Sequence, residues 1–181
     1  MRKSLTAAVS ATAIALAVPA ITSTQTASAA PDSLVSVVCT GSDTTNYSPG
    51  LRTTSQTVST YGTDEGHGCT GLGRISGLTS FSASFTGQYT ASCLSPIQSG
   101  SGTETLTWND GSTSTWQWSS SVATNSAGQL VGTYNGPITS GAYAGTNLNN
   151  TDVEPNTNVA ACTAAPGLTQ TTGTATWTFT S

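Results

Sequence analysis

The stretch TETLTWNDGSTSTWQW, residues 103–118, holds two short runs of alternating side chains on either side of an Asn-Asp-Gly turn. Leu106 and Trp108 share one parity in the first run, and Trp116 and Trp118 share one in the second. Alternation with a period of two is typical of antiparallel strands that have one buried and one solvated face. The stretch is therefore predicted to form a β-hairpin, and the length of its turn decides where the tryptophans point.

A two-residue Asp-Gly loop would send the two sets of tryptophans to opposite faces of the hairpin. A three-residue loop, residues 109–111, instead pairs residue 104 with residue 116 and places Leu106 and all three tryptophans on one face. Gly111 then occupies the left-handed bulge position that such loops favour. This register favours the tryptophans as part of the core. The alternative is an exposed aromatic platform that stacks on sugar rings.

The same register places Glu104 on the inward face, opposite Trp116. We expect its carboxylate to lie at the rim of the fold, in contact with water. The alternative is a half-buried acid with a raised pKa and a function of its own. If the hairpin binds a ligand, the candidate residues are Trp108, Trp116, Trp118 and Glu104.

The rest of the chain repeats this alternation. Ala175, Trp177 and Phe179 alternate with threonines, and residues 81–93 carry apolar side chains at every second position over most of their length. Clusters of Gly, Asn, Asp and Pro separate the runs. The expected fold is all-β: an antiparallel β-sandwich, immunoglobulin-like or similar, with two disulfides.

The N-terminal residues have the pattern of a signal peptide. Arg2 and Lys3 precede an apolar run, residues 5–18, that is too short to cross a bilayer, and Ala27-Ser28-Ala29 supplies a cleavage pattern. We expect a signal peptide at residues 1–29 and a single secreted domain at residues 30–181. The expected location is extracellular, without a membrane anchor.

The charges of the expected mature domain bear on its partners. It has two cations, Arg52 and Arg74, against eight acids. Nucleic acids and anionic membranes are bound by clusters of Lys and Arg, so this balance argues against both. An extracellular polysaccharide or protein remains as a partner, and the sequence does not indicate an oligomeric state.

Four cysteines in an exported chain predict two disulfides. In a weak internal repeat, Cys93 and Cys162 are each followed, about ten residues later, by a similar strand, residues 102–108 and 173–179. If these two strands are neighbours, Cys93 pairs with Cys162 and Cys39 pairs with Cys69. The cysteines do not have the spacing of a zinc site, and we expect no metal.

The sequence lacks the residues that several kinds of catalysis need. His67 is the only histidine, and it lies between glycines, outside any nucleophile motif. The mature chain has neither a lysine for a Schiff base nor a phosphate-binding loop, and we expect no cofactor. Two acids can hydrolyse a glycoside, and Glu104 with Asp110 or Asp152 is the pair that this chain offers.

The order of motifs along the mature chain resembles a family of small exported bacterial β-proteins without a known activity. Between Cys39 and Cys162 these motifs are Tyr47-Ser-Pro-Gly-Leu51, Phe85-Thr-Gly87, Trp108-Asn-Asp-Gly-Ser112 and Ile138-Thr-Ser-Gly141. The resemblance implies an exported domain with paired cysteines and carries over no catalytic residue. In general design the chain is also similar to the immunoglobulin-like apoproteins of chromoprotein antibiotics.

The first functional expectation is a secreted, non-enzymatic β-sandwich that acts as an extracellular binding or structural module. The second is a carbohydrate-binding module or small glycosidase that uses the aromatic residues of the 104–118 hairpin. The third is a protein inhibitor or a small-ligand carrier.

Overall fold

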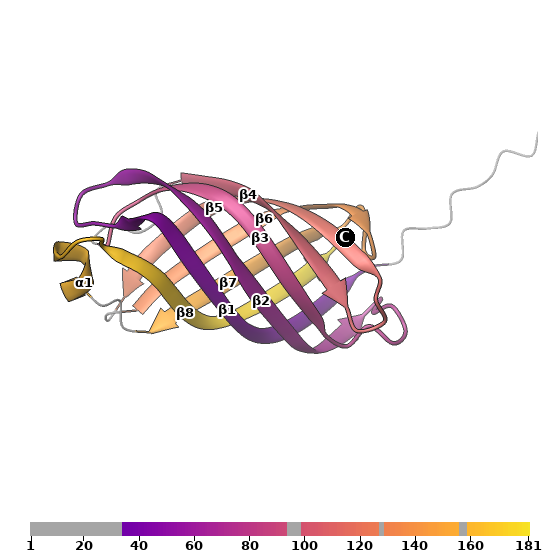
Figure 1. The fold of residues 1–181 in the computed structure, drawn as a ribbon. Helices are drawn as coiled ribbons and strands as arrows, with labels where there is room; N and C mark the ends of the chain where they lie inside the picture. Colours follow the sequence, from indigo (N-terminus) through magenta and orange to yellow (C-terminus); the bar gives the residue numbers. More distant parts are fainter. Residues whose placement is uncertain (1–33, 94–98, 127–128, 156–158) are drawn as a thin grey trace, which may run out of the picture. The chain divides into compact units, whose positions relative to one another are not determined.

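The computed structural model describes residues 34–93, 99–126, 129–155 and 159–181, and the expected signal peptide lies outside this range. Eight strands and one short helix, α1 (Val159–Thr163), make up the described fold (Figure 1). The strands are β1 (Ser36–Leu51), β2 (Gln56–Leu72), β3 (Phe81–Ala91), β4 (Ser99–Trp108), β5 (Thr113–Ser126), β6 (Gln129–Gly141), β7 (Asn147–Pro155) and β8 (Leu168–Thr180).

The strands form one closed antiparallel barrel, not the sandwich that the sequence predicted. Each strand pairs with the next in the chain, and β1 also pairs with β8, which closes the sheet. Alternating side chains indicate that one face of a strand is buried. The same pattern occurs in two packed sheets and in one sheet closed into a barrel, so it does not distinguish them. The all-β class and the alternation are confirmed; the sandwich is wrong.

The hairpin of β4 and β5 has the register that the three-residue turn predicts. Glu104 is opposite Trp116 and Leu106 is opposite Ser114, while the backbone N–H of Trp108 donates to the carbonyl of Ser112 at 2.8 Å. Gly111 adopts a φ of 85°, the left-handed conformation expected of it. The inward face of the hairpin therefore points into the barrel.

Large inward side chains lie over inward glycines. A Cβ atom at Gly87 or at Gly102 would overlap the indole of Trp118, and one at Gly62 would overlap the ring of Phe85. An eight-stranded barrel is just wide enough for its interior to be filled by side chains, and alternating small and large residues fill it best. These strand glycines thus make room for the aromatic interior.

One half of the barrel is an apolar core. Trp108 packs edge-on against Phe81, with ring centroids 5.3 Å apart, and also contacts Phe179. Phe81 makes a second edge-on contact with Trp177. The indole N–H of Trp108 donates to the hydroxyl of Ser114 at 2.8 Å, so even the polar atom of this side chain has a partner.

The other half contains a second aromatic group, which includes the remaining two tryptophans of the hairpin. Trp118 contacts Trp116, Tyr89 and Tyr134, with the ring of Tyr134 edge-on at 5.4 Å. All three hairpin tryptophans are therefore inside the barrel, as the register predicts, but they divide between two aromatic groups. The platform interpretation is wrong, because a platform needs exposed indoles.

Two disulfides cross-link the barrel, and their pairing is the one expected from the sequence. Cys39–Cys69 links the neighbouring strands β1 and β2, and Cys93–Cys162 links the segment after β3 to α1, which lies at one end of the barrel (Figure 1). The premise of the prediction is nevertheless wrong, since residues 102–108 lie in β4 and residues 173–179 in β8, which are not neighbours. Disulfides of this kind are typical of proteins from oxidising compartments.

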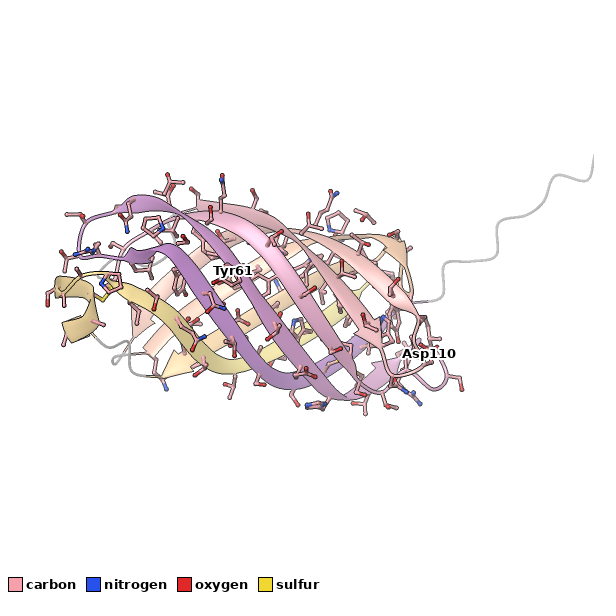
Figure 2. All side chains as sticks on the ribbon, viewed as in Figure 1. Tyr61 and Asp110 are labelled. Carbon is pink, nitrogen blue, oxygen red and sulfur yellow. A yellow bond between two sulfur atoms is a disulfide. The ribbon has the colours of Figure 1, made fainter. Side chains whose placement is uncertain are left out.

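The outer wall carries mostly short polar side chains (Figure 2). Tyr61 on β2 stands there, 55% exposed, and Asp110 lies in the turn between β4 and β5. Within the described part of the chain, no helix has the length and apolarity to span a membrane.

We expect Trp108→Ala to lower the free energy of unfolding by about 3–5 kcal/mol, because it removes a fully buried indole and leaves a cavity. Tyr61→Ala is the matched control and should change this free energy by less than about 0.5 kcal/mol, since its ring is exposed. Urea unfolding of the oxidised mature domain measures both. Similar values for the two variants would contradict the assignment of Trp108 to the core.

Candidate functional site

Five carboxylates point into the barrel and form what we call the acid belt. They are Asp43 on β1, Asp64 on β2, Glu104 on β4, and Asp152 and Glu154 on β7. Four of them are almost wholly buried, Glu104 with only 2% of its surface exposed, and Asp152 is half-buried. Asp43 and Asp64 are direct register partners on neighbouring strands. Ionised carboxylates so placed would repel each other, so the belt departs from ordinary barrel packing.

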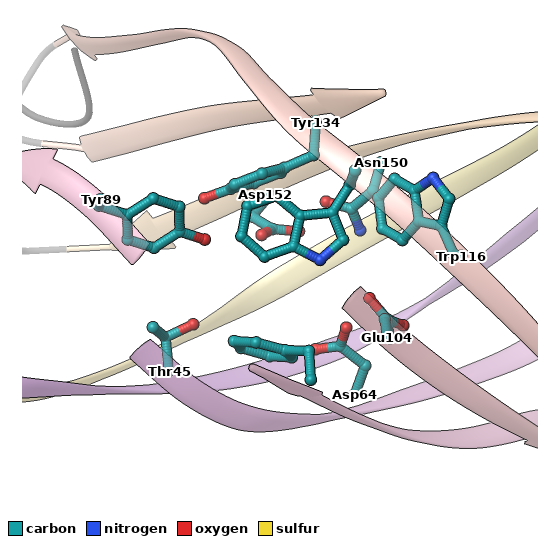
Figure 3. Close-up of a pocket in the computed structure, with 10 residues that line it drawn as sticks. Thr45, Asp64, Tyr89, Glu104, Trp116, Tyr134, Asn150 and Asp152 are labelled. Carbon is teal, nitrogen blue, oxygen red and sulfur yellow. The ribbon is translucent and has the colours of Figure 1, made fainter. Parts of the chain in front are cut away.

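Three acids of the belt border a small cavity beside the second aromatic group (Figure 3). Its free volume is about 20 Å³, which is enough for one water molecule. In Figure 3, Asp64 and Glu104 approach the cavity from one side and Asn150, Asp152 and Tyr134 from the other. The residues that line it are Thr45, Asp64, Phe85, Tyr89, Glu104, Trp116, Trp118, Tyr134, Asn150 and Asp152.

Asp64 and Glu104 share a hydrogen bond. Burial raises the pKa of both carboxyls, and the repulsion between them raises that of Asp64 further. The pKa of Glu104 rises from 4.5 to about 8, because burial outweighs the hydrogen bond donated by Asp64. The hydrogen bond between them requires a proton on one of the two carboxyls, and Asp64 is the donor. Two acids that share a proton avoid the energy of two adjacent buried charges.

The other acids of the belt also bind protons more tightly than exposed carboxyls do. Burial raises the pKa of Asp43 to about 6 and that of Glu154 to about 7. The pKa of Asp152 lies well above its ordinary value, through burial and through repulsion from Asp43 and Asp64, although Asn150 donates a hydrogen bond to it. No positive side chain is among the causes that shift these pKa values.

Glu154 ends a chain of hydroxyl groups. The Thr171 hydroxyl donates to its Oε1 at 2.6 Å, and the Tyr47 hydroxyl donates to Thr171 Oγ1 at 2.9 Å. The hydroxyl of Thr171 thus donates to one oxygen of Glu154. The other oxygen, the buried Oε2, has no partner among the described residues.

The described cations lie away from the belt. The guanidinium of Arg74 donates to the backbone carbonyls of Ile75 and Leu78, Arg52 lies between β1 and β2, and His67 is exposed. Within the described ranges, no three His, Cys, Asp or Glu side chains form a group suited to hold a metal ion.

The structure brings together three of the four candidate residues of the hairpin. Glu104, Trp116 and Trp118 line the cavity, whereas Trp108 belongs to the apolar core. The expectation that Glu104 lies at the rim is wrong: its strand runs along a closed wall, so an inward carboxylate has no rim to reach. Of its suggested catalytic partners, Asp152 lines the same cavity, and Asp110 lies exposed in the turn, where Ser112 donates two hydrogen bonds to it.

Sequence reasoning missed most of the belt. Asp43 has the same parity as the apolar Val37 and Cys39, which are buried, so the alternation contained a signal for it. Asp152 was named only as a possible catalytic partner of Glu104. Asp64 and Glu154 lie in polar stretches without such alternation, and only the closed sheet brings them together.

No protein-family model, no curated protein and no solved structure matches this chain.

The raised pKa values predict how stability changes with pH. An acid whose pKa is higher in the folded than in the unfolded state holds its proton more tightly when folded. The free energy of unfolding therefore falls as pH rises from the unfolded value, near 4.5 for Glu104, to the folded value of about 8. Between pH 5 and pH 8 we expect a loss of at least ~2 kcal/mol, or roughly 4–8 °C in Tm.

Glu104→Gln mimics the protonated acid and should reduce this pH dependence, with the larger gain in Tm at pH 8. The exposed Glu65→Gln is the control and should change the dependence far less, since Glu65 is the smallest of the named causes that raise the pKa of Asp64. Calorimetric melts across this pH range measure the effect. Constant or rising stability between pH 5 and pH 8 would contradict the assignment of buried, protonated acids.

Proposed function

We propose that this protein is an exported, non-enzymatic binding barrel that holds a small ligand in its interior cavity. Its site comprises Asp64, Glu104, Asn150 and Asp152, with Trp116, Trp118, Tyr89 and Tyr134 as aromatic walls. The observation that carries the proposal is a set of buried, unpartnered polar atoms around one cavity.

Buried polar atoms in proteins nearly always have hydrogen-bond partners, because an unmet one costs about 1–3 kcal/mol. Asp64 Oδ1, Glu104 Oε1, Asn150 Oδ1 and Asp152 Oδ1 are all buried without a partner among the described residues. All four belong to residues that line the same cavity. Four such atoms around one cavity support a ligand site over a structural core, which apolar side chains would fill at lower cost.

The fold supplies what such a site needs. The lining residues lie on paired strands, and the aromatic ones among them, such as Trp118 and Tyr134, pack against each other. The site is therefore built on rigid elements. Small closed barrels commonly enclose one small ligand. The two disulfides and the export pattern of the N-terminus support a role outside the cell, where a bound small molecule would be sequestered or delivered.

The cavity also bears on the glycosidase alternative. Glu104 and Asp152 flank it, but about 20 Å³ of free volume admits a group the size of a water molecule and no sugar ring. Retaining and inverting hydrolysis both place a sugar between two carboxyl groups. The enclosed site therefore favours binding of a small group over glycoside hydrolysis.

Fragment screening by NMR tests this function. The library should contain cationic, neutral and anionic compounds of a few heavy atoms each. We expect at least one class to shift the indole N–H signals of Trp116 and Trp118 while the signal of Trp108 moves less. Shifts confined to exposed residues such as Tyr61, with every class of compound, would contradict an interior site.

A further inference from the structure

We propose that the interior site takes a small primary ammonium group, held between the Asp64–Glu104 pair and the Asn150–Asp152 pair. This inference rests on the proposed function, because it names the chemical class of ligand for the same cavity.

The unpartnered atoms of the cavity are oxygens, and they lie on Asp64, Glu104, Asn150 and Asp152. The amide of Asn150 already donates to Asp152, and the indole N–H of Trp116 donates to the carbonyl of Gly136 at 3.1 Å. Of the four unpartnered oxygens, only those of the acids can become donors, and only by holding protons. A ligand that fits must bring N–H or O–H groups, and a primary ammonium brings three N–H groups in a compact head.

The cavity also lacks positive charge. Three carboxyl groups of the acid belt line it, those of Asp64, Glu104 and Asp152, and the described arginines and His67 are not among its lining residues. A buried carboxylate is stable when it is neutralised by a proton or paired with a cation. Protons can neutralise the belt when the cavity holds no cation. An ammonium group would replace at least one of these protons and allow Glu104 to ionise.

The walls favour an organic cation over a bare metal ion. Rings of Trp116, Trp118, Tyr89, Tyr134 and Phe85 line the cavity beside the oxygens. Aromatic faces attract cations, and Trp does so most strongly. Calcium and magnesium instead take six or more oxygen ligands. The free volume matches one water molecule, so it fits an –NH₃⁺ head, and neighbouring side chains must shift to admit the carbon attached to it.

Binding should release protons. The titratable groups that face the site are Asp43 from β1, Asp64 from β2, Tyr89 from β3, Glu104 from β4, Tyr134 from β6, and Asp152 and Glu154 from β7. The tyrosines stay neutral between pH 5 and pH 8, because burial raises their pKa further. Alkylammonium groups resemble the lysine head and remain charged over the same range. The acids alone therefore exchange protons for the ligand, which must bind more tightly at pH 8 than at pH 5.

The test is calorimetric titration of the oxidised mature domain with methylammonium chloride at pH 8 and pH 5. Tetramethylammonium chloride, which has the same charge but no N–H, and sodium chloride serve as matched probes at equal ionic strength. We expect a Kd for methylammonium at least tenfold lower at pH 8 than at pH 5. Tetramethylammonium and sodium should bind at least tenfold more weakly than methylammonium. At pH 7, titrations in two buffers of different ionisation enthalpy should show about one proton released for each ammonium bound.

Glu104→Gln should weaken methylammonium binding at least tenfold at pH 8, and Glu65→Gln should not change it. The comparison of probes on the unaltered protein needs no variant, so the test stands even if Glu104→Gln does not fold. Equal responses to all three salts, or binding without proton release, would overturn the proposal. If neutral fragments shift Trp116 and Trp118 but methylammonium does not bind, the interior site stands and the ammonium assignment fails.

Discussion

The width of an eight-stranded closed barrel is the constraint on which this structure depends. The interior of such a barrel holds little more than the side chains that point into it. Each large side chain must therefore face a small one, and the indole of Trp118 is accommodated where Gly87 and Gly102 have no side chain. The same packing leaves a small cavity beside the second aromatic group, and it determines which polar side chains border that cavity.

The acid belt is the feature that this packing does not require. Apolar residues in place of Asp64 and Glu104 would fill the same space without the cost of burying carboxyl groups. Burial instead raises their pKa values, and that of Glu104 to about 8, so that Glu104 holds its proton at neutral pH. The stability of the barrel is therefore coupled to the charge inside it. Loss of protons from the belt destabilises the barrel unless a bound cation balances the carboxylates. This coupling underlies both the predicted pH dependence and the proposed ligand.

Local patterns in the sequence predicted a good part of the fold. Parity and turn length in residues 103–118 were enough to place the three tryptophans inside and to give the register of Glu104 against Trp116, because a hairpin is determined by neighbouring residues. Closure of the sheet was not predicted, since the pairing of β1 with β8 joins residues far apart in the chain. The sandwich and the rim position of Glu104 failed for this one reason. The acid belt collects residues from four strands, and so it could not be assembled before the barrel was known.

The central claim is that the carboxyl groups inside the barrel hold their protons at a pH where exposed carboxyl groups have lost theirs. Carbon-13 NMR of the side-chain carboxyls, followed from pH 3 to pH 9, tests it residue by residue. The account predicts that the signals of Asp64, Glu104 and Asp152 titrate well above that of the exposed Asp110, with an apparent pKa of about 8 for Glu104. Titration of all these groups together near pH 4 would contradict it.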